Sequence, residues 1–163
     1  MESVTEDSIL ELIKQHENAV KEIDTYQTQF FDKAAKKMKP FSDILSKYKI
    51  RFLQVPIKVN TNYGNFSSQG KVNLVVTEKG VGILDFSKDV NDKHRFVELS
   101  FNTYKKLPND VERNNLTELT RFIANNISGI QEEEVKGIYS FYKEKLDSTQ
   151  STSTEWFMLN QSI

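Results

Sequence analysis

The chain has 163 residues, a net charge of −1 and no cysteine. This length is typical of one domain and lets the chain bury roughly 70% of its unfolded surface. The lack of cysteine excludes disulfides, thiol catalysis and thiolate metal sites, and it favours a reducing, cytoplasmic setting. No apolar run reaches the ~20 residues of a membrane helix, and the acidic N-terminus does not resemble a signal peptide.

Residues 1–48 are predicted to form one long amphipathic helix. Ser3-Val4-Thr5-Glu6 fits a capping box, which satisfies two backbone donors at a helix start. The side chains that follow at spacings of three and four share one face. They are Ile9, Leu12, Ile13, His16, Ala19, Val20, Ile23, Tyr26, Phe30, Ala34 and Met38. Pro40 is expected to kink or end the helix, and the pattern resumes as far as Tyr48.

Four strands are predicted after this helix. Alternating apolar residues place them at about 52–59, 72–76, 81–86 and 96–101. Pro56 has no N–H for a strand ladder, so the first strand is expected at an edge or with a bulge. Short connections predict an antiparallel meander.

The C-terminal third is predicted to hold two helices and a tail. The first helix begins near Asn109, a break is expected at Ser128-Gly129, and the second ends near Leu146. Residues 148–154 resemble a polar linker, and residues 156–159 form an apolar tail. The prediction is therefore an α+β fold with a single domain at 1–147 and a separate tail at 148–163.

The sequence contains few residues in arrangements typical of an active site. His16 lies on the apolar stripe, where a core or interface role is the simpler interpretation, and His94 lies in a charged loop. Asp85 and Glu98 are placed where they could pair across strands and share a proton, although two solvated carboxylates are the favoured interpretation. We therefore expect no enzyme, no cofactor and no metal site.

A basic segment follows the middle of the long helix. It comprises Lys33, Lys36, Lys37, Lys39, Lys47, Lys49 and Arg51. Only Asp32 and Asp43 oppose these charges, so the segment could follow a phosphate backbone. The favoured alternative is that acid near the start of the helix and base near its end complement the helix dipole.

A protein partner is the preferred functional hypothesis. The long helix extends beyond what a sheet of short strands can cover, because six residues of strand span only about 20 Å. An antiparallel homodimer through this helix is preferred, and the tail either docks on its own domain or binds a partner. The predicted contact residues are Ile9, Ile13, His16, Val20, Ile23, Phe30, Trp156 and Phe157.

The function that follows is a non-enzymatic adaptor, inhibitor or assembly factor that acts inside the cell. The abundance of Lys, Asn, Ile, Phe and Tyr is typical of an AT-rich genome, such as a low-GC bacterium, a phage or a plasmid. The alternative function is a nucleic-acid-binding accessory protein that uses the basic segment.

Overall fold

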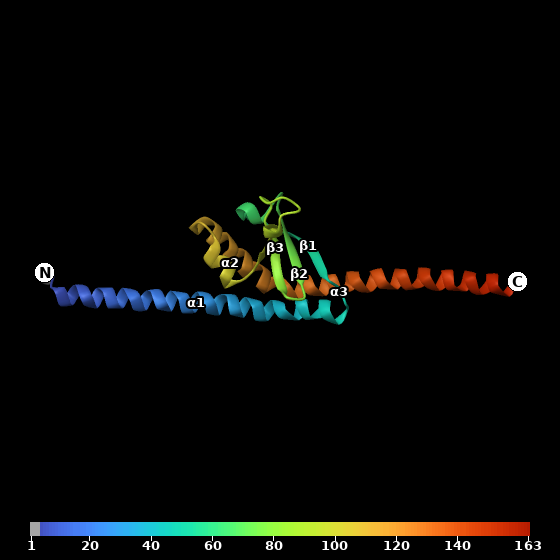
Figure 1. Cartoon of the computed structure of the whole chain (residues 1–163), viewed down its shortest axis with the longest axis horizontal. Coiled ribbons are helices and arrows are strands. Elements are labelled where there is room, and N and C mark those ends of the chain that lie inside the picture. The colour runs from blue at the N-terminus through green and yellow to red at the C-terminus, as the bar shows by residue number, and fades with distance from the viewer. Residues whose placement is uncertain (1–3) are drawn as a thin grey trace. The chain divides into compact units, whose positions relative to one another are not determined.

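The computed structural model describes residues 4–163 and has the predicted α+β fold (Figure 1). A long N-terminal helix precedes a four-stranded antiparallel sheet, and two helices follow the sheet. The helices are α1 (Glu6–Lys47), α2 (Phe101–Lys106) and α3 (Asp110–Gln161). The strands are β1 (Phe52–Lys58), β2 (Lys71–Thr77), β3 (Gly80–Leu84) and β4 (Phe96–Glu98). Two short 3-10 helices are η1 (Gly64–Phe66) and η2 (Lys93–Arg95).

The chain divides into two compact units. The first unit ends at Asn125, and the second comprises Asn126–Ile163. The predicted boundary at residue 147 therefore does not coincide with the division between the units. Among residues 4–163, none of the helices combines the length and the apolarity needed to cross a membrane.

Helix α1 is continuous over 42 residues. Its N-cap is Thr5, whose hydroxyl accepts a hydrogen bond from the Ser8 N–H at 3.1 Å. The predicted cap at Ser3 lies outside the described residues. Pro40 does not end the helix, although it removes one backbone hydrogen bond. Its neighbours Met38 and Phe41 are buried, and this burial favours continued helix across the proline.

The sheet is a simple meander in the order β1-β2-β3-β4. Pro56 lies in the edge strand β1 opposite Asn73, as the missing N–H predicted. Leu74 of β2 lies between Val55 of β1 and Ile83 of β3 in the ladder, and all three side chains are buried. This register brings the apolar sides of three strands into one surface.

Gly82 of β3 is required by close packing against β4. A Cβ atom at this position would lie 2.4 Å from the Phe96 ring and 2.5 Å from the Val97 carbonyl oxygen. The Val97 carbonyl belongs to the backbone of the paired strand, so it cannot move without disturbing the ladder. Only glycine therefore fits here.

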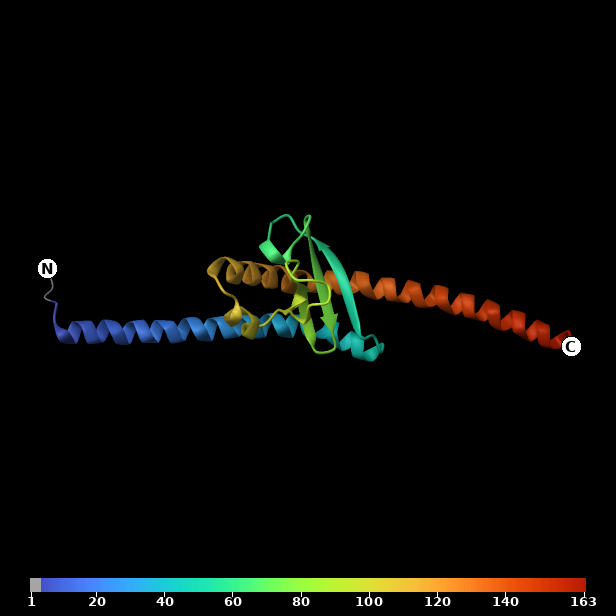
Figure 2. The same ribbon diagram turned by 45° about the horizontal axis from the view of Figure 1, so that its top comes forward.

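The core of the first unit lies between the second half of α1, the sheet and the start of α3. Helix α1 packs against β2 and β3, and it runs beside the sheet in both views (Figure 1 and Figure 2). The largest fully buried side chains from these elements are Phe41, Leu45, Leu74, Ile83, Leu116, Leu119 and Ile123. Phe66 of η1, in the connection between β1 and β2, is also buried.

The structure corrects the predicted end of the fourth strand. Strand β4 ends at Glu98, and Phe101 begins α2. The Ser100 hydroxyl accepts a hydrogen bond from the Thr103 N–H at 3.3 Å and caps this helix. The alternating pattern predicted that the strand continues to Phe101, but the cap at Ser100 starts a helix there instead.

The predicted break at Ser128-Gly129 is wrong, and so is the predicted linker at 148–154. Both segments lie inside α3, which is continuous over 52 residues. A glycine inside a helix costs only about 1 kcal/mol and need not end it. In the supposed linker, the Thr149 and Thr152 hydroxyls donate to the carbonyls of Lys145 and Ser148, four residues back. These bonds satisfy the polar side chains within the helix.

Candidate interaction surface on helix α1

The first half of α1 exposes its apolar face to solvent. We call residues Glu6–Tyr26 the α1 arm, and every residue of it is exposed. Ile13, Val20 and Ile23 are 49%, 50% and 56% exposed. With Ile9, Leu12 and Tyr26 they form what we call the arm stripe. Most helices in folded proteins gain stability by packing such a face, so the arm stripe is a candidate contact surface.

The arm stripe continues directly into the buried face of the same helix. From Ile9 to Leu45 the face advances in steps of only three or four residues, which keeps it on one side of an α-helix. Its members beyond the arm include Phe31, Ala34, Met38 and Phe41, all of which are buried. One helix face is therefore core over its second half and solvent-exposed over its first half.

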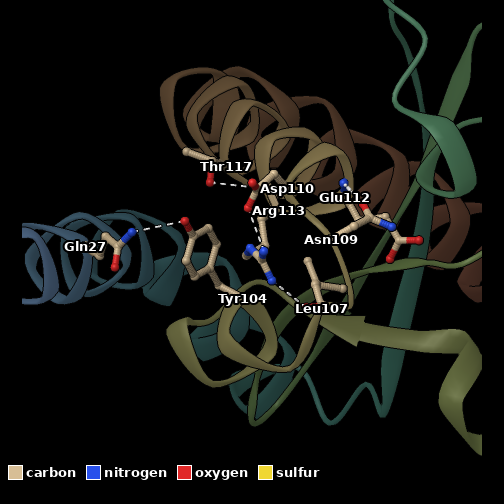
Figure 3. A network of polar contacts seen from close by, with 8 residues as sticks. All are labelled: Gln27, Tyr104, Leu107, Asn109, Asp110, Glu112, Arg113 and Thr117. Atoms are coloured by element: carbon tan, nitrogen blue, oxygen red, sulfur yellow. Dashed lines mark hydrogen bonds and ion pairs between the residues drawn. The ribbon is translucent and has the colours of Figure 1, made fainter.

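A polar and aromatic contact marks where burial begins. The side-chain amide of Gln27 donates to the hydroxyl of Tyr104 in α2 at 3.0 Å (Figure 3). The Phe31 ring lies 5.6 Å from the Tyr104 ring and 6.1 Å from the Phe101 ring. Phe30, a predicted contact residue, is half-buried and meets Phe31 edge-on at 5.1 Å. Helix α2 therefore covers α1 only from about Gln27 onward.

Arg113 fixes the start of α3 beside this contact (Figure 3). Its guanidinium donates to the Leu107 carbonyl at 2.7 Å and to the Asp110 carboxylate at 2.6 Å. The Asn109 side chain accepts from the Glu112 N–H at 2.9 Å and caps the helix. These bonds join the end of α2 to the first turn of α3.

The other predicted contact residues lie at two separate places. His16 lies within the exposed α1 arm, on the same helix face as the arm stripe. Trp156 and Phe157 lie in α3 and are both 63% exposed. The predicted apolar tail at 156–159 is therefore the last part of a helix.

The basic segment is fully exposed. All seven of its side chains are accessible, and those in α1 lie away from the buried face. Lys39 forms an ion pair with Asp43 at 3.0 Å, and Lys37 donates to Asn125 at 3.4 Å. A pocket of about 370 Å³ beside Lys36 and Lys39 is also lined by Asp43, Glu78 and Glu98. These carboxylates oppose binding of phosphate at this side of the segment.

The candidate acid/base pair is not assembled. The β3–β4 register places Glu98 opposite Gly82, whereas the Asp85 N–H bonds to the carbonyl of Arg95. Asp85 and Glu98 are thus about 10 Å apart along the ladder, at roughly 3.3 Å per residue. The Asp85 carboxylate instead accepts from the Ser87 N–H at 2.9 Å and from its hydroxyl at 2.6 Å. Within residues 4–163, no three His, Asp or Glu side chains are grouped to hold a metal ion.

Comparison of the chain with protein-family models, with curated proteins and with solved structures gave no match.

Proposed function

We propose that this protein is a protein-interaction module that self-associates through the α1 arm. The observation that carries the proposal is the continuity of the arm stripe with the core face of the same helix. On the covered half of this face, residues such as Phe41 and Leu45 are buried in the core of the first unit. On the other half, equally apolar residues such as Ile13 and Ile23 are exposed to solvent. A helix of this length gains most of its stability from packing, so a partner would stabilise the arm.

The spacing of the arm supports another helix as the partner. Ile9, Ile13, His16, Val20 and Ile23 follow a heptad pattern with alternating steps of four and three. The 21 residues of the arm provide three heptads. A second copy of the chain supplies a helix of matching length and pattern, so a homodimer is the proposed assembly. The role that suits such a module is that of an adaptor, inhibitor or assembly factor.

Sedimentation equilibrium with a matched pair of variants tests this proposal. Ile23→Glu places a charge on the arm stripe, and Thr25→Glu places the same charge two residues away on the opposite side of the helix. We expect the wild-type chain and Thr25→Glu to dimerise at micromolar concentration and Ile23→Glu to remain monomeric. A wild-type chain that is strictly monomeric at high micromolar concentration would contradict the proposal. An Ile23→Glu dimer as tight as the wild type would contradict it as well.

Nucleic-acid binding through the basic segment is the second candidate function. Its supporting observation is the exposure of Lys33, Lys36, Lys37 and Lys47 along α1. Binding of this kind weakens steeply with salt, because each phosphate contact releases a counterion. Salt-dependent binding to DNA or RNA that is lost in a Lys36→Glu, Lys37→Glu, Lys39→Glu variant would support it. Absence of binding at low salt would exclude it.

A further inference from the structure

A pocket of the first unit lies between α1 and the turn that joins β2 to β3. Its volume of about 370 Å³ falls in the lower part of the range of roughly 300–1,000 Å³ that is typical of small-molecule sites. The buried part of its apolar lining comes from Met38, Val81 and Leu99. Its charged lining is exposed and comprises Lys36, Lys39, Asp43, Glu78, Lys79 and Glu98. The pocket therefore offers an apolar surface beside charges of both signs.

Ser42 of α1 also lines the pocket and is only 4% exposed. Its hydroxyl is buried and has no hydrogen-bond partner within residues 4–163. This differs from Thr28 and Thr120, whose hydroxyls donate to helix carbonyls four residues back at 2.9 and 2.7 Å. An unpaired buried hydroxyl is costly, so a ligand atom that pairs with it gains affinity. The Ser42 hydroxyl therefore indicates where a polar group of a ligand would be held.

Most of the charges around the pocket do not pair with one another. Lys39 and Asp43 form an ion pair at 3.0 Å. The other four charged side chains form no ion pair within the described part of the chain; they are Lys36, Glu78, Lys79 and Glu98. Opposite charges that line one pocket without meeting can be bridged by a ligand that carries both. Two cations and two carboxylates are thus left to bind such a ligand.

The turn that carries Glu78 and Lys79 is held by its own hydrogen bonds. The Thr77 hydroxyl donates to the Gly80 carbonyl at 3.2 Å and accepts from the Lys79 N–H, also at 3.2 Å. A Cβ atom on Gly80 would lie 3.9 Å from the Glu98 carboxylate, so this carboxylate lies beside the turn. The turn therefore presents charges of both signs from a fixed backbone.

Two simpler ligands fit this lining less well. The carboxylates of Asp43, Glu78 and Glu98 are not grouped to hold a metal ion, since no three such side chains meet in this way among residues 4–163. A phosphate would be attracted by the lysines and repelled by the same carboxylates. Cations and carboxylates are equal in number around the pocket, so a molecule with one charge of each sign and no net charge fits best.

We infer that this pocket binds an α-amino acid that has an apolar side chain. Lys36, Lys79 and the Ser42 hydroxyl hold its carboxylate. Glu78 and Glu98 hold its ammonium group, and its side chain packs on the apolar lining. The pocket lies outside the α1 arm, so the inference does not depend on self-association.

Calorimetric titration of the full chain with three related compounds tests the inference. L-leucine carries both charges, N-acetyl-L-leucine lacks the ammonium group, and L-leucinamide lacks the carboxylate. We expect L-leucine to bind at least about tenfold more tightly than either derivative, because each derivative loses one set of charge-assisted bonds. The ¹⁵N amide signals of Ser42, Gly80 and Val81 should shift on binding. Absence of binding at about 10 mM L-leucine, or equal binding of all three compounds, would overturn the inference.

A matched pair of serine variants tests the role of the buried hydroxyl. Ser42→Ala should weaken binding of L-leucine at least about tenfold, because a hydrogen bond to a charged group is lost. Its thermal midpoint without ligand should not fall, since the variant removes an unpaired buried hydroxyl. Ser46→Ala, one turn further along α1, changes an exposed residue and should bind as the wild type does. Unchanged binding by Ser42→Ala would overturn the inference.

A charge variant tests which side chains hold the ammonium group. In the double variant Glu78→Gln, Glu98→Gln, L-leucine should lose its advantage over N-acetyl-L-leucine, which has no ammonium group. Its advantage over L-leucinamide should remain, because Lys36 and Lys79 still attract the carboxylate. If the advantage over N-acetyl-L-leucine persists in full, the two carboxylates do not hold the ammonium group and the inference is overturned.

Discussion

The hydrogen bond from Gln27 to the Tyr104 hydroxyl, at 3.0 Å, lies at the point where α1 changes from an exposed helix to a core helix. Residues before it are exposed throughout the α1 arm. The inner-face residues after it, beginning with Phe31, are buried in the core of the first unit, and the Phe31 ring packs against Tyr104 of α2. The bond satisfies a polar side chain at a position that the heptad pattern assigns to an apolar one. The bond therefore lies at the N-terminal edge of the part of α1 that packs into the core of the first unit.

Removing this bond should destabilise the first unit slightly. We expect Tyr104→Phe to lower the free energy of unfolding by about 0.5–1.5 kcal/mol, because the partly buried Gln27 amide loses its acceptor. Urea denaturation at one fixed protein concentration measures the change. Gln15→Ala is the control, because it removes only an exposed contact with Glu11. Equal stability of Tyr104→Phe and the wild type would show that the bond contributes nothing.

The core of the first unit should be sensitive to loss of volume. Leu119→Ala should cost about 2–5 kcal/mol, since the side chain is fully buried. Val111→Ala, in the exposed first turn of the same helix, should change stability by less than about 0.5 kcal/mol. Thermal or urea unfolding of both variants gives the comparison. Similar losses in the two variants would mean that α3 does not pack as described.

Two glycines should respond in opposite directions to alanine. Gly82→Ala should destabilise the sheet by about 1–3 kcal/mol, because its Cβ would collide with the Phe96 ring and the Val97 carbonyl. Gly137→Ala meets no atom within 4 Å and should stabilise α3 by up to about 1 kcal/mol. Circular dichroism during urea unfolding measures both. A neutral Gly82→Ala would contradict the close β3–β4 contact.

Pro40→Ala should stabilise α1. The alanine N–H restores the hydrogen bond to the Lys36 carbonyl and removes the clash of the proline ring with it. The gain should reach up to about 3 kcal/mol, reduced by the greater freedom of the unfolded chain. A lower midpoint of thermal unfolding than the wild type would indicate that the proline is needed in this helix.

Much of the fold follows from periodicity. Alternating apolar residues such as Val72, Leu74 and Val76 and the short connections between strands predicted the meander. The edge position of Pro56 followed from its missing N–H. Helix boundaries were predicted less well. Breaker residues such as Gly129 carry only a modest local cost, which a continuous helix can absorb. Cap geometry at Ser100 became evident only with the backbone conformation.

The interaction surface was partly visible in the sequence. The stripe from Ile9 to Met38 was predicted, but its division into covered and exposed halves depends on where α2 meets α1. That contact joins Gln27 to Tyr104, which are far apart in the sequence, and no local pattern indicates it. The continuation of α3 through residues 148–154 was missed because the Ser and Thr residues there resemble a linker. Self-association remains a prediction.

Amide hydrogen exchange of the α1 arm at two protein concentrations tests the central claim most directly. Residues around Phe41 should be protected at both concentrations, because they belong to the core of the first unit. Residues 9–26 should be protected at high concentration and should exchange quickly when the chain is diluted below the dissociation constant of the dimer. Fast exchange of residues 9–26 at every concentration, or protection that does not change on dilution, would contradict the account.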